Sequence, residues 1–531
     1  MIKNPFNPIS SAKKIPFKKM GEYISYLNDE PFVILYSYND YWGVPLVSGS
    51  NMTLNHITLS DLCKKQLGFS LKFKRISPDM YEDNSYAKHI MSGDRGDLIF
   101  PKQLTGGKRF STGDHYWCDR YIRQGIYKDL TPYIERFCPE AIIQFERYPE
   151  IKAMCVKEGK TYAIYAGMPD ISVLTLIAKN DLLNDNGINI QDINNFDALF
   201  EFMKSLYQGR EPTSDFNKIM VNPVWLFKYA VYNSGYYPMN FDMYDVVFKI
   251  NDERCIPYLV ENTEIFPYFM ECFSRFFTCS YFTSEYLYIY MEPHKNYDLY
   301  ITANPLFFIN RQSRFCTNDT NNFFTNHSIV LFDDQKVLIN DFTNILLITV
   351  PEASEQPEKA LIFMQWLMTN QEAADILTFG SRLMGSNHFR YSYDGTIIPE
   401  KYNTIYVFYN LVSNFSEKAF LSGNKDFDIS QQYKELTLHA EYPTLYNMID
   451  AQHPHYLTFE EFDESIEPVQ YKRKAYIDNC LSELMNNPDN RIDANKITTE
   501  LYELTDTEKM IEDYREFVRK IFESGEVIYG N

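Results

Sequence analysis

The sequence predicts an α/β fold in which parallel strands alternate with helices. In the first hundred residues, apolar runs rich in β-branched and aromatic residues alternate with helical patterns. The alternation returns later, where a buried strand precedes a pair of amphipathic helices. The chain has 531 residues, of which 45% are hydrophobic, so it can build more than one large core.

The N-terminal elements follow a strand–helix–strand order after a leader. Residues 1–30 are basic and rich in Pro, Ser and Asn, so we expect a leader without regular structure. The elements expected after it are a strand over 31–38, a helix from the cap Thr58 to Gly68, a strand over 71–76, a helix over 81–91 and a strand over 97–100. Strands joined by helices in this way pair in parallel.

The central elements are expected between residues 125 and 207. They are a helix within 125–135, a turn and strand over 159–165, a strand over 171–178, a helix over 181–186 ended by Gly187, and a helix capped by Asn195. Apolar residues recur every three or four positions after Asn195, which is the helical period. Gly187 suits the left-handed conformation that often ends a helix.

The C-terminal elements are mostly helical. A buried strand is expected over 345–350, and Pro357 suits the first position of the helix after it. The patterns Thr369-x-x-Glu372 and Thr505-x-x-Glu508 are typical of capping boxes, so each predicts a helix start. We expect Gly380 and Gly525 to end these helices. The apolar stripe of the last helix is expected to pack on its parent domain.

Composition and motifs exclude several classes of protein. The formal net charge of −20 opposes binding to phosphate backbones, so nucleic acid is not an expected partner. The nine cysteines are odd in number and contain no C-x-x-C pair, so we expect reduced structural thiols and no metal site. The Gly-Gly-Lys at 106–108 lacks phosphate-loop spacing. No cofactor and no catalytic residue are expected.

Two ordered segments resemble the extracellular solute-binding proteins of bacterial ABC importers. Segment 125–207 contains GIYKDLTPYIERF, GKTYAIY, LTLIAKNDLLNDNGIN and NNFDALFEFMKSL in the order of that family. Segment 350–380, VPEASEQPEKALIFMQWLMTNQEAADILTFG, is similar to a second family signature. The helical tail resembles that of the sugar-binding, lipoprotein-type subgroup with a C-terminal extension. Tyr165 stands where the family commonly has proline.

This resemblance implies a two-lobed, type II periplasmic-binding-protein-like fold with a helical C-terminal region. The implied division is a leader over 1–30, a first lobe over 31–165 and 330–420, and a second lobe over 166–329 and 421–531. The chain would cross between the lobes near 165–176 and again near 326–345. Residues 166–169 suit a hinge, because Gly167 permits backbone rotation.

The candidate ligand site follows from the strand ends. Ligands of open α/β sheets bind outside the carboxyl ends of strands. Aromatic faces such as those of Trp42 and Trp225 suit stacking on a sugar. Asp40, Asp170 and Asn304 offer polar groups for hydroxyls or an amine. The predicted ligand-binding residues are Asn39, Asp40, Tyr41, Trp42, Phe100, Tyr165, Asp170, Trp225 and Asn304.

The resemblance implies capture of a small polar ligand without catalysis. An oligosaccharide is expected first, and a peptide remains open. The expected partners are ABC permease subunits, the chain is expected to be a monomer, and the location is expected to be the cell surface. No secretory signal is visible in this sequence, so a cytoplasmic location is the alternative. Two other functions remain open, namely a cytoplasmic ligand sensor or interaction protein on the same fold, and a glycoside hydrolase.

Overall fold

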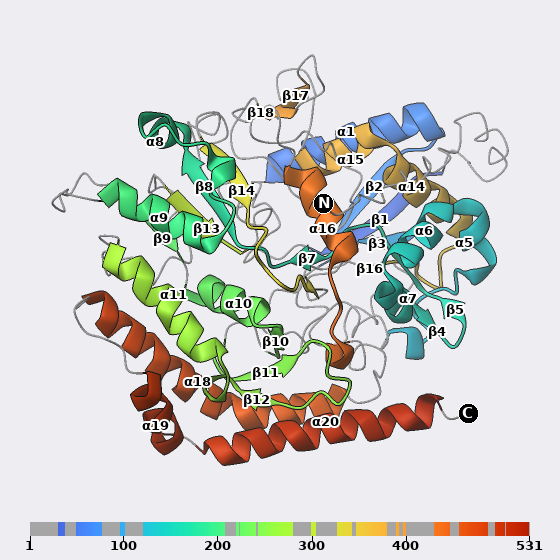
Figure 1. Ribbon diagram of the computed structural model, residues 1–531. Helices are drawn as coiled ribbons and strands as arrows, with labels where there is room; N and C mark the ends of the chain where they lie inside the picture. Colours follow the sequence, from blue (N-terminus) through green and yellow to red (C-terminus); the bar gives the residue numbers. More distant parts are fainter. Residues whose placement is uncertain are drawn as a thin grey trace, which may run out of the picture.

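Two strand-and-helix bodies lie side by side, and a layer of helices runs along one side of the molecule (Figure 1). The computed structural model describes residues 30–37, 49–76, 96–100, 121–207, 219–221, 223–239, 243–279, 299–303, 327–341, 347–379, 389–391, 397–399, 429–446, 456–486, 494–504 and 506–529.

The first body is built on a five-stranded sheet in the order β2-β1-β3-β16-β6. Its strands are β1 (Phe32–Ser37), β2 (Leu71–Ile76), β3 (Leu98–Phe100), β6 (Ala163–Tyr165) and β16 (Leu347–Thr349). β1 pairs in parallel with β2 and with β3, as the alternating pattern predicts. β16 is antiparallel to both of its neighbours because the chain returns to this sheet from the second one.

Helices pack around the first sheet. They are α1 (Gly49–Leu67), α5 (Thr131–Phe137), α6 (Pro139–Arg147), α7 (Pro149–Cys155), α14 (Pro357–Thr369) and α15 (Gln371–Phe379). Pro lies at the start of α5, α6, α7 and α14, where its missing N–H costs no hydrogen bond. The hydrophobic faces of these helices and the sheet form the first core.

The second body is built on a four-stranded sheet in the order β14-β8-β13-β9. Its strands are β8 (Thr175–Lys179), β9 (Ile219–Val221), β13 (Leu299–Thr302) and β14 (His327–Leu331), and its helices are α8 (Asn180–Asp185), α9 (Phe196–Tyr207), α10 (Pro223–Asn233) and α11 (Ile265–Cys279). Alternate residues of β8 face different cores, since Ile177 belongs to the first and Leu176 to the second.

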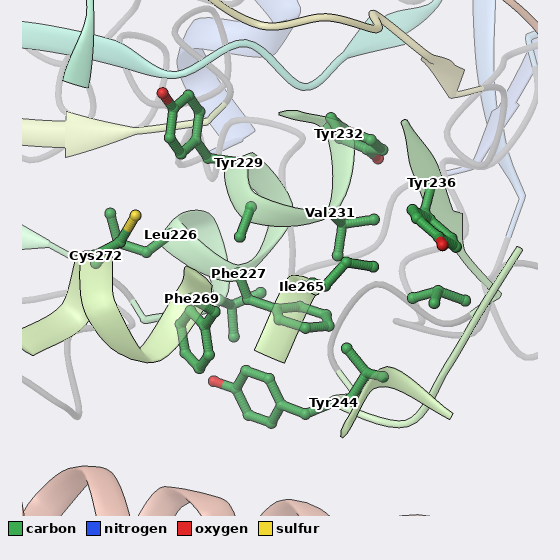
Figure 2. Packing of buried hydrophobic residues seen from close by; sticks show 14 of the residues in the cluster. Leu226, Phe227, Tyr229, Val231, Tyr232, Tyr236, Tyr244, Ile265, Phe269 and Cys272 are labelled. Carbon is green, nitrogen blue, oxygen red and sulfur yellow. The ribbon is translucent and has the colours of Figure 1, made fainter. Parts of the chain in front are cut away.

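A small antiparallel sheet and the C-terminal helices complete the second core. The sheet consists of β10 (Tyr236–Pro238), β11 (Val246–Lys249) and β12 (Tyr258–Leu259), and the helices are α18 (Tyr456–Asn486), α19 (Ala494–Leu504) and α20 (Thr507–Tyr529). Phe227 of α10 contacts the rings of Tyr244 and Phe269 edge-on, at 4.9 and 5.5 Å between centroids (Figure 2). The apolar stripe of α20 is buried in this core, as expected.

Shorter elements connect these layers. They are β4 (Val156–Lys157), β5 (Lys160–Thr161), β7 (Asp170–Ile171), β15 (Asn340–Asp341), β17 (Phe389–Tyr391), β18 (Ile397–Pro399), α16 (Ile429–His439) and the 3-10 turns η2 (Ile190–Asp192) and η3 (Val260–Asn262). β7 and β15 pair with each other between the two main sheets.

Some predicted boundaries are wrong. α1 begins at Gly49, so Thr58 lies inside the helix and does not cap it, and Gly68 follows its end with a φ of +89°. The predicted strand over 171–178 is divided into β7 and β8 because the chain crosses between sheets there. The helix predicted over 81–91 lies outside the described residues.

Predicted helix caps are also corrected in detail. The side chain that caps α15 is Asn370, whose Oδ1 accepts from Ala373 N at 3.0 Å, whereas Thr369 bonds back to Gln365 O. Asp506 caps α20, and Thr505 lies outside the described residues. The last helix also runs past its predicted end at Gly525, to Tyr529.

The Asn195 cap is confirmed. Its Oδ1 accepts a hydrogen bond from Ala198 N at 2.8 Å at the start of α9. Gly187 has a φ of +64° directly after α8, so its predicted role at a helix end is also confirmed. Gly380 lies outside the described residues.

Candidate functional site

The carboxyl ends of the parallel strands in the first sheet lie at one edge. In the pair β1–β3, Tyr36 lies opposite Phe100. β16 is antiparallel to both β3 and β6, so β6 points the same way as β3 and its last residue, Tyr165, reaches the same edge. Because ligands of open α/β sheets bind outside this edge, it forms the first half of the candidate site.

The second sheet presents a corresponding edge. β13 is parallel to β9 and antiparallel to β8, which places its end at Thr302 beside Thr175, the start of β8. β14 also ends beside Thr175, at Leu331. The chain passes from Tyr165 to Thr175 in one short crossing. The edges of both sheets therefore adjoin the same crossing.

Two crossings connect the sheets and are linked to each other by hydrogen bonds. β7 of the first crossing pairs with β15 of the second. The side-chain amide of Gln335 accepts from Leu174 N at 2.6 Å and donates to Ser172 O at 3.1 Å. Val173 N donates to Ala303 O at 2.9 Å. Backbone groups of the buried crossing are thus satisfied by partners from other segments.

A third segment, 429–446, lies across these crossings. It contains α16, which contacts β7, and residue Glu441, which forms a parallel bridge with Ile339. Figure 1 shows α16 between the two strand-and-helix bodies. Sequence reasoning missed this segment as part of the site region, because nothing near it in the sequence indicates its distant partners.

The structure places Phe100, Tyr165 and Asp170 at the edge of the first sheet and in the first crossing. All three are buried, and Tyr165 is completely so. Its ring packs edge-on against Tyr148, at 6.0 Å between centroids. Burial, with the nearby Tyr148, Asp170 and Tyr433, raises the pKa of Tyr165 well above its ordinary value. The side chain of Tyr165 therefore carries a neutral hydroxyl group at pH 7.

Trp225 lies where the two bodies meet. It belongs to the first turn of α10, directly after the carboxyl end of β9. Its neighbours Leu226 and Phe227 are buried in the second core, whereas Trp225 is half-buried and packs against the first core. An indole ring at this place offers an apolar face to a ligand held between the sheets.

The remaining predicted site residues lie outside the described residues. They are Asn39, Asp40, Tyr41, Trp42 and Asn304. The first four follow β1 and the last follows β13, so the described strands lead to them from the two edges. Their ligand contacts stay a prediction.

An aromatic cluster near the end of β1 was not predicted. The His56 ring stacks on Phe73 at 3.8 Å between centroids, and Tyr36 contacts both rings. Burial lowers the pKa of His56 to about 4, so this ring is neutral at pH 7. His56, Leu59 and Cys63 follow the helical period, and this signal would have located His56 had the start of α1 been placed earlier.

The described part of the chain contains no group of three or more His, Cys, Asp or Glu residues that could hold a metal ion. Among the same residues, no helix is both long and apolar enough to cross a bilayer.

Comparison with known proteins identifies relatives by structure alone. No protein-family model matches this sequence, and no curated protein matches it. The N-glycan transport solute binding protein of Streptococcus pneumoniae matches with a TM-score of 0.55 and 12% identity, over 93% of this chain and 99% of that chain. Its complex with Man1GlcNAc matches with a TM-score of 0.51 and 13% identity, over 93% and 100%.

A third solved structure is the ABC-transporter substrate binding protein FusA of S. pneumoniae in complex with kestose. It matches with a TM-score of 0.47 and 12% identity, over 92% of this chain and 99% of that chain. The two structures of the N-glycan transport protein show that this chain has the two-lobed α/β fold of solute-binding proteins over almost its whole length. The predicted fold class is confirmed.

Proposed function

We propose that this protein is the solute-binding component of an ABC importer and captures an oligosaccharide between its two lobes. The observation that carries the proposal is the meeting of two sheet edges at one crossing, in a chain with the solute-binding fold. Carboxyl ends of strands from both sheets adjoin that crossing, where open α/β sheets bind small molecules.

Aromatic side chains at these edges support a sugar as the ligand. Trp225 extends from the second body towards the first, and the cluster of Tyr36, His56 and Phe73 lies near the end of β1. Sugar rings have apolar faces that stack on aromatic rings, while a few placed polar groups fix their hydroxyls. Asp170 supplies such a group in the first crossing.

The proposal includes binding without turnover. The Tyr165 hydroxyl stays protonated, so it suits a hydrogen bond to a ligand or neighbour rather than proton abstraction. The partners would be membrane permease subunits that receive the sugar, and the location would be outside the cytoplasmic membrane. The alternative, a cytoplasmic sensor on this fold, differs in its partner and in its location.

The test is isothermal calorimetry with a panel of oligosaccharides that begins with Man1GlcNAc, the ligand of one structural relative. For the best ligand, Trp225→Ala should weaken binding by about 1–3 kcal/mol, because the ring loses a desolvated contact. Trp225→Phe should retain much of the affinity. Tyr471→Ala removes an exposed ring on α18 and should leave affinity unchanged.

Equal affinity of the Trp225→Ala variant and the unchanged protein would contradict the placement of the ligand. Absence of binding to the whole panel would contradict the proposed function. Mass spectrometry of the recovered sugar should show no change in its mass, and a shortened sugar would indicate a glycoside hydrolase instead.

A further inference from the structure

Tyr433 joins the first core to the first crossing. Its ring is completely buried in the first core. Its hydroxyl accepts a hydrogen bond from Ile171 N at 2.7 Å and donates one to Ile171 O at 3.2 Å. The Tyr433 hydroxyl therefore bonds to both the N–H and the carbonyl group of Ile171 in β7.

The rest of the third segment is bound to the second crossing. Asn340 Nδ2 donates to the carbonyl groups of Thr437 and Ala440, at 3.2 and 3.4 Å. The backbone of Glu441 accepts from Asn340 N and donates to Leu338 O, both at 2.8 Å. The segment thus lies against β15 through several bonds.

The same segment then enters the second core. Leu445 and Tyr446 are completely buried there, and the Tyr446 hydroxyl donates to Pro238 O. Segment 429–446 is therefore a third connection between the two bodies, next to the crossings that contain β7 and β15.

Residues 166–169 lie in the first crossing just before Ile171, the residue that Tyr433 binds, and Ala166 and Met168 are buried in the first core. Ile171, Val173 and Leu174 of the first crossing each donate their N–H to another segment, and residues 166–169 precede these bonded positions. A bend between the bodies would concentrate at 166–169, where Gly167 permits it. Tyr433 forms its hydrogen bonds with Ile171, two residues after the end of that bend.

From these contacts we propose that the Tyr433 hydroxyl restrains the hinge and favours the present arrangement of the two bodies. This rests on the proposed function, because hinge motion matters for capture of a ligand. Without the hydroxyl, the buried Ile171 N–H loses its acceptor, and an unsatisfied buried donor is unfavourable. Opening of the hinge would let water accept a hydrogen bond from the Ile171 N–H. The equilibrium between the present arrangement and a more open form would therefore shift towards the open form.

The experiment compares Tyr433→Phe with Tyr148→Phe in the ligand-free protein. Tyr148 is the matched control, because its buried hydroxyl forms a hydrogen bond of 3.0 Å with the side chain of Thr437, which lies in α16 like Tyr433. Hydrogen exchange of the peptide over 166–175 and the radius of gyration from small-angle scattering are measured for each.

Tyr433→Phe should speed exchange of the Ile171 amide by about fivefold or more, as expected for loss of one hydrogen bond, and should increase the radius of gyration. Tyr148→Phe should change neither quantity. Equal behaviour of the two variants, or faster exchange without a change in the radius of gyration, would overturn the proposal. If Tyr433→Phe does not fold, Asn340→Ala tests the same restraint from the second crossing.

Failure of this proposal can be distinguished from failure of the proposed function. The hinge experiment contains no ligand, so it reports only on the connection between the bodies. Oligosaccharide binding measured by calorimetry could succeed with an unrestrained hinge, and a restrained hinge could occur without oligosaccharide binding.

Discussion

At the scale of single residues, the side chains that organise the site region have partners far away in the sequence. Gln335 bonds to Ser172 and Leu174, and Tyr433 bonds to Ile171. Each forms a hydrogen bond with backbone groups of the first crossing. Polar side chains therefore supplement the short β7–β15 pair where the chain passes between the sheets.

Strand-end reasoning could place some residues at the sheet edges but could not identify these partners. Phe100, Tyr165 and Asp170 lie at or after predicted strands, so their position followed from the local pattern. Tyr433 and Gln335 carry no local signal, because their roles depend on contacts across more than a hundred residues of sequence. Only the folded chain identifies them.

The cysteine thiols should be reduced. The described structure contains six free cysteines, and burial raises the pKa of Cys138 and Cys272 to about 12 and of Cys255 to about 11. Few of these thiols are ionised at pH 8, so they should react slowly in the native protein.

Thiol titration of the denatured, unreduced protein should find nearly all nine cysteines free. The same titration without denaturant should proceed much more slowly. Recovery of fewer than half of the thiols after denaturation would contradict the reduced state.

At the scale of elements, the sequence predicts helices and strands better than it predicts their ends. The α14–α15 boundary shows the reason. Thr369 and Asn370 are both good capping residues, and the tertiary structure decides between them. Asn370 also donates to Gln66 Oε1 of α1 at 2.6 Å, and this distant contact is absent from any local pattern.

Replacement of the two candidate caps distinguishes their roles. Asn370→Ala should lower the free energy of unfolding by about 1–2 kcal/mol, because the cap bond to Ala373 N is lost. Thr369→Ala should cost less than about 0.5 kcal/mol, since its hydroxyl only bonds back to Gln365 in an exposed position. Urea unfolding followed by circular dichroism provides the comparison, and equal losses would refute the assignment of the cap.

The C-terminal helices are part of the second core rather than an appendage. Arg473 of α18 forms a bidentate pair with Glu261 of η3, at 2.7 and 2.6 Å, and both side chains are buried. Arg473 Nη1 also donates to Thr507 at the start of α20. One guanidinium group therefore joins two C-terminal helices to the body that precedes them.

Arg473→Leu should lower the free energy of unfolding by about 3–5 kcal/mol, because it leaves the buried Glu261 carboxylate without its partner. Arg515→Leu is the control, since Arg515 is exposed and pairs with Glu512 on the surface of α20. It should cost less than about 1 kcal/mol. Guanidinium unfolding of both variants measures the two losses in free energy of unfolding. Losses of similar size would show that the buried Arg473–Glu261 pair contributes no more to stability than the surface pair does.

At the scale of the whole molecule, the predicted α/β class is confirmed by the parallel β1–β2 and β1–β3 pairs and by the structural relatives. Periodicity predicted this class because each buried strand is short and bounded by helices. The lobe boundaries stay a prediction. The third connection, over 429–446, could not be predicted from the sequence, because a helical pattern does not indicate which core the helix packs against.

The central claim is capture of an oligosaccharide between the two lobes, and small-angle scattering with a ligand verified by calorimetry tests it most directly. A sugar that contacts both lobes binds the closed form better and must shift the population towards closure. The account predicts a smaller radius of gyration with saturating ligand than without it. A ligand-saturated protein whose radius of gyration equals that of the ligand-free protein would contradict it.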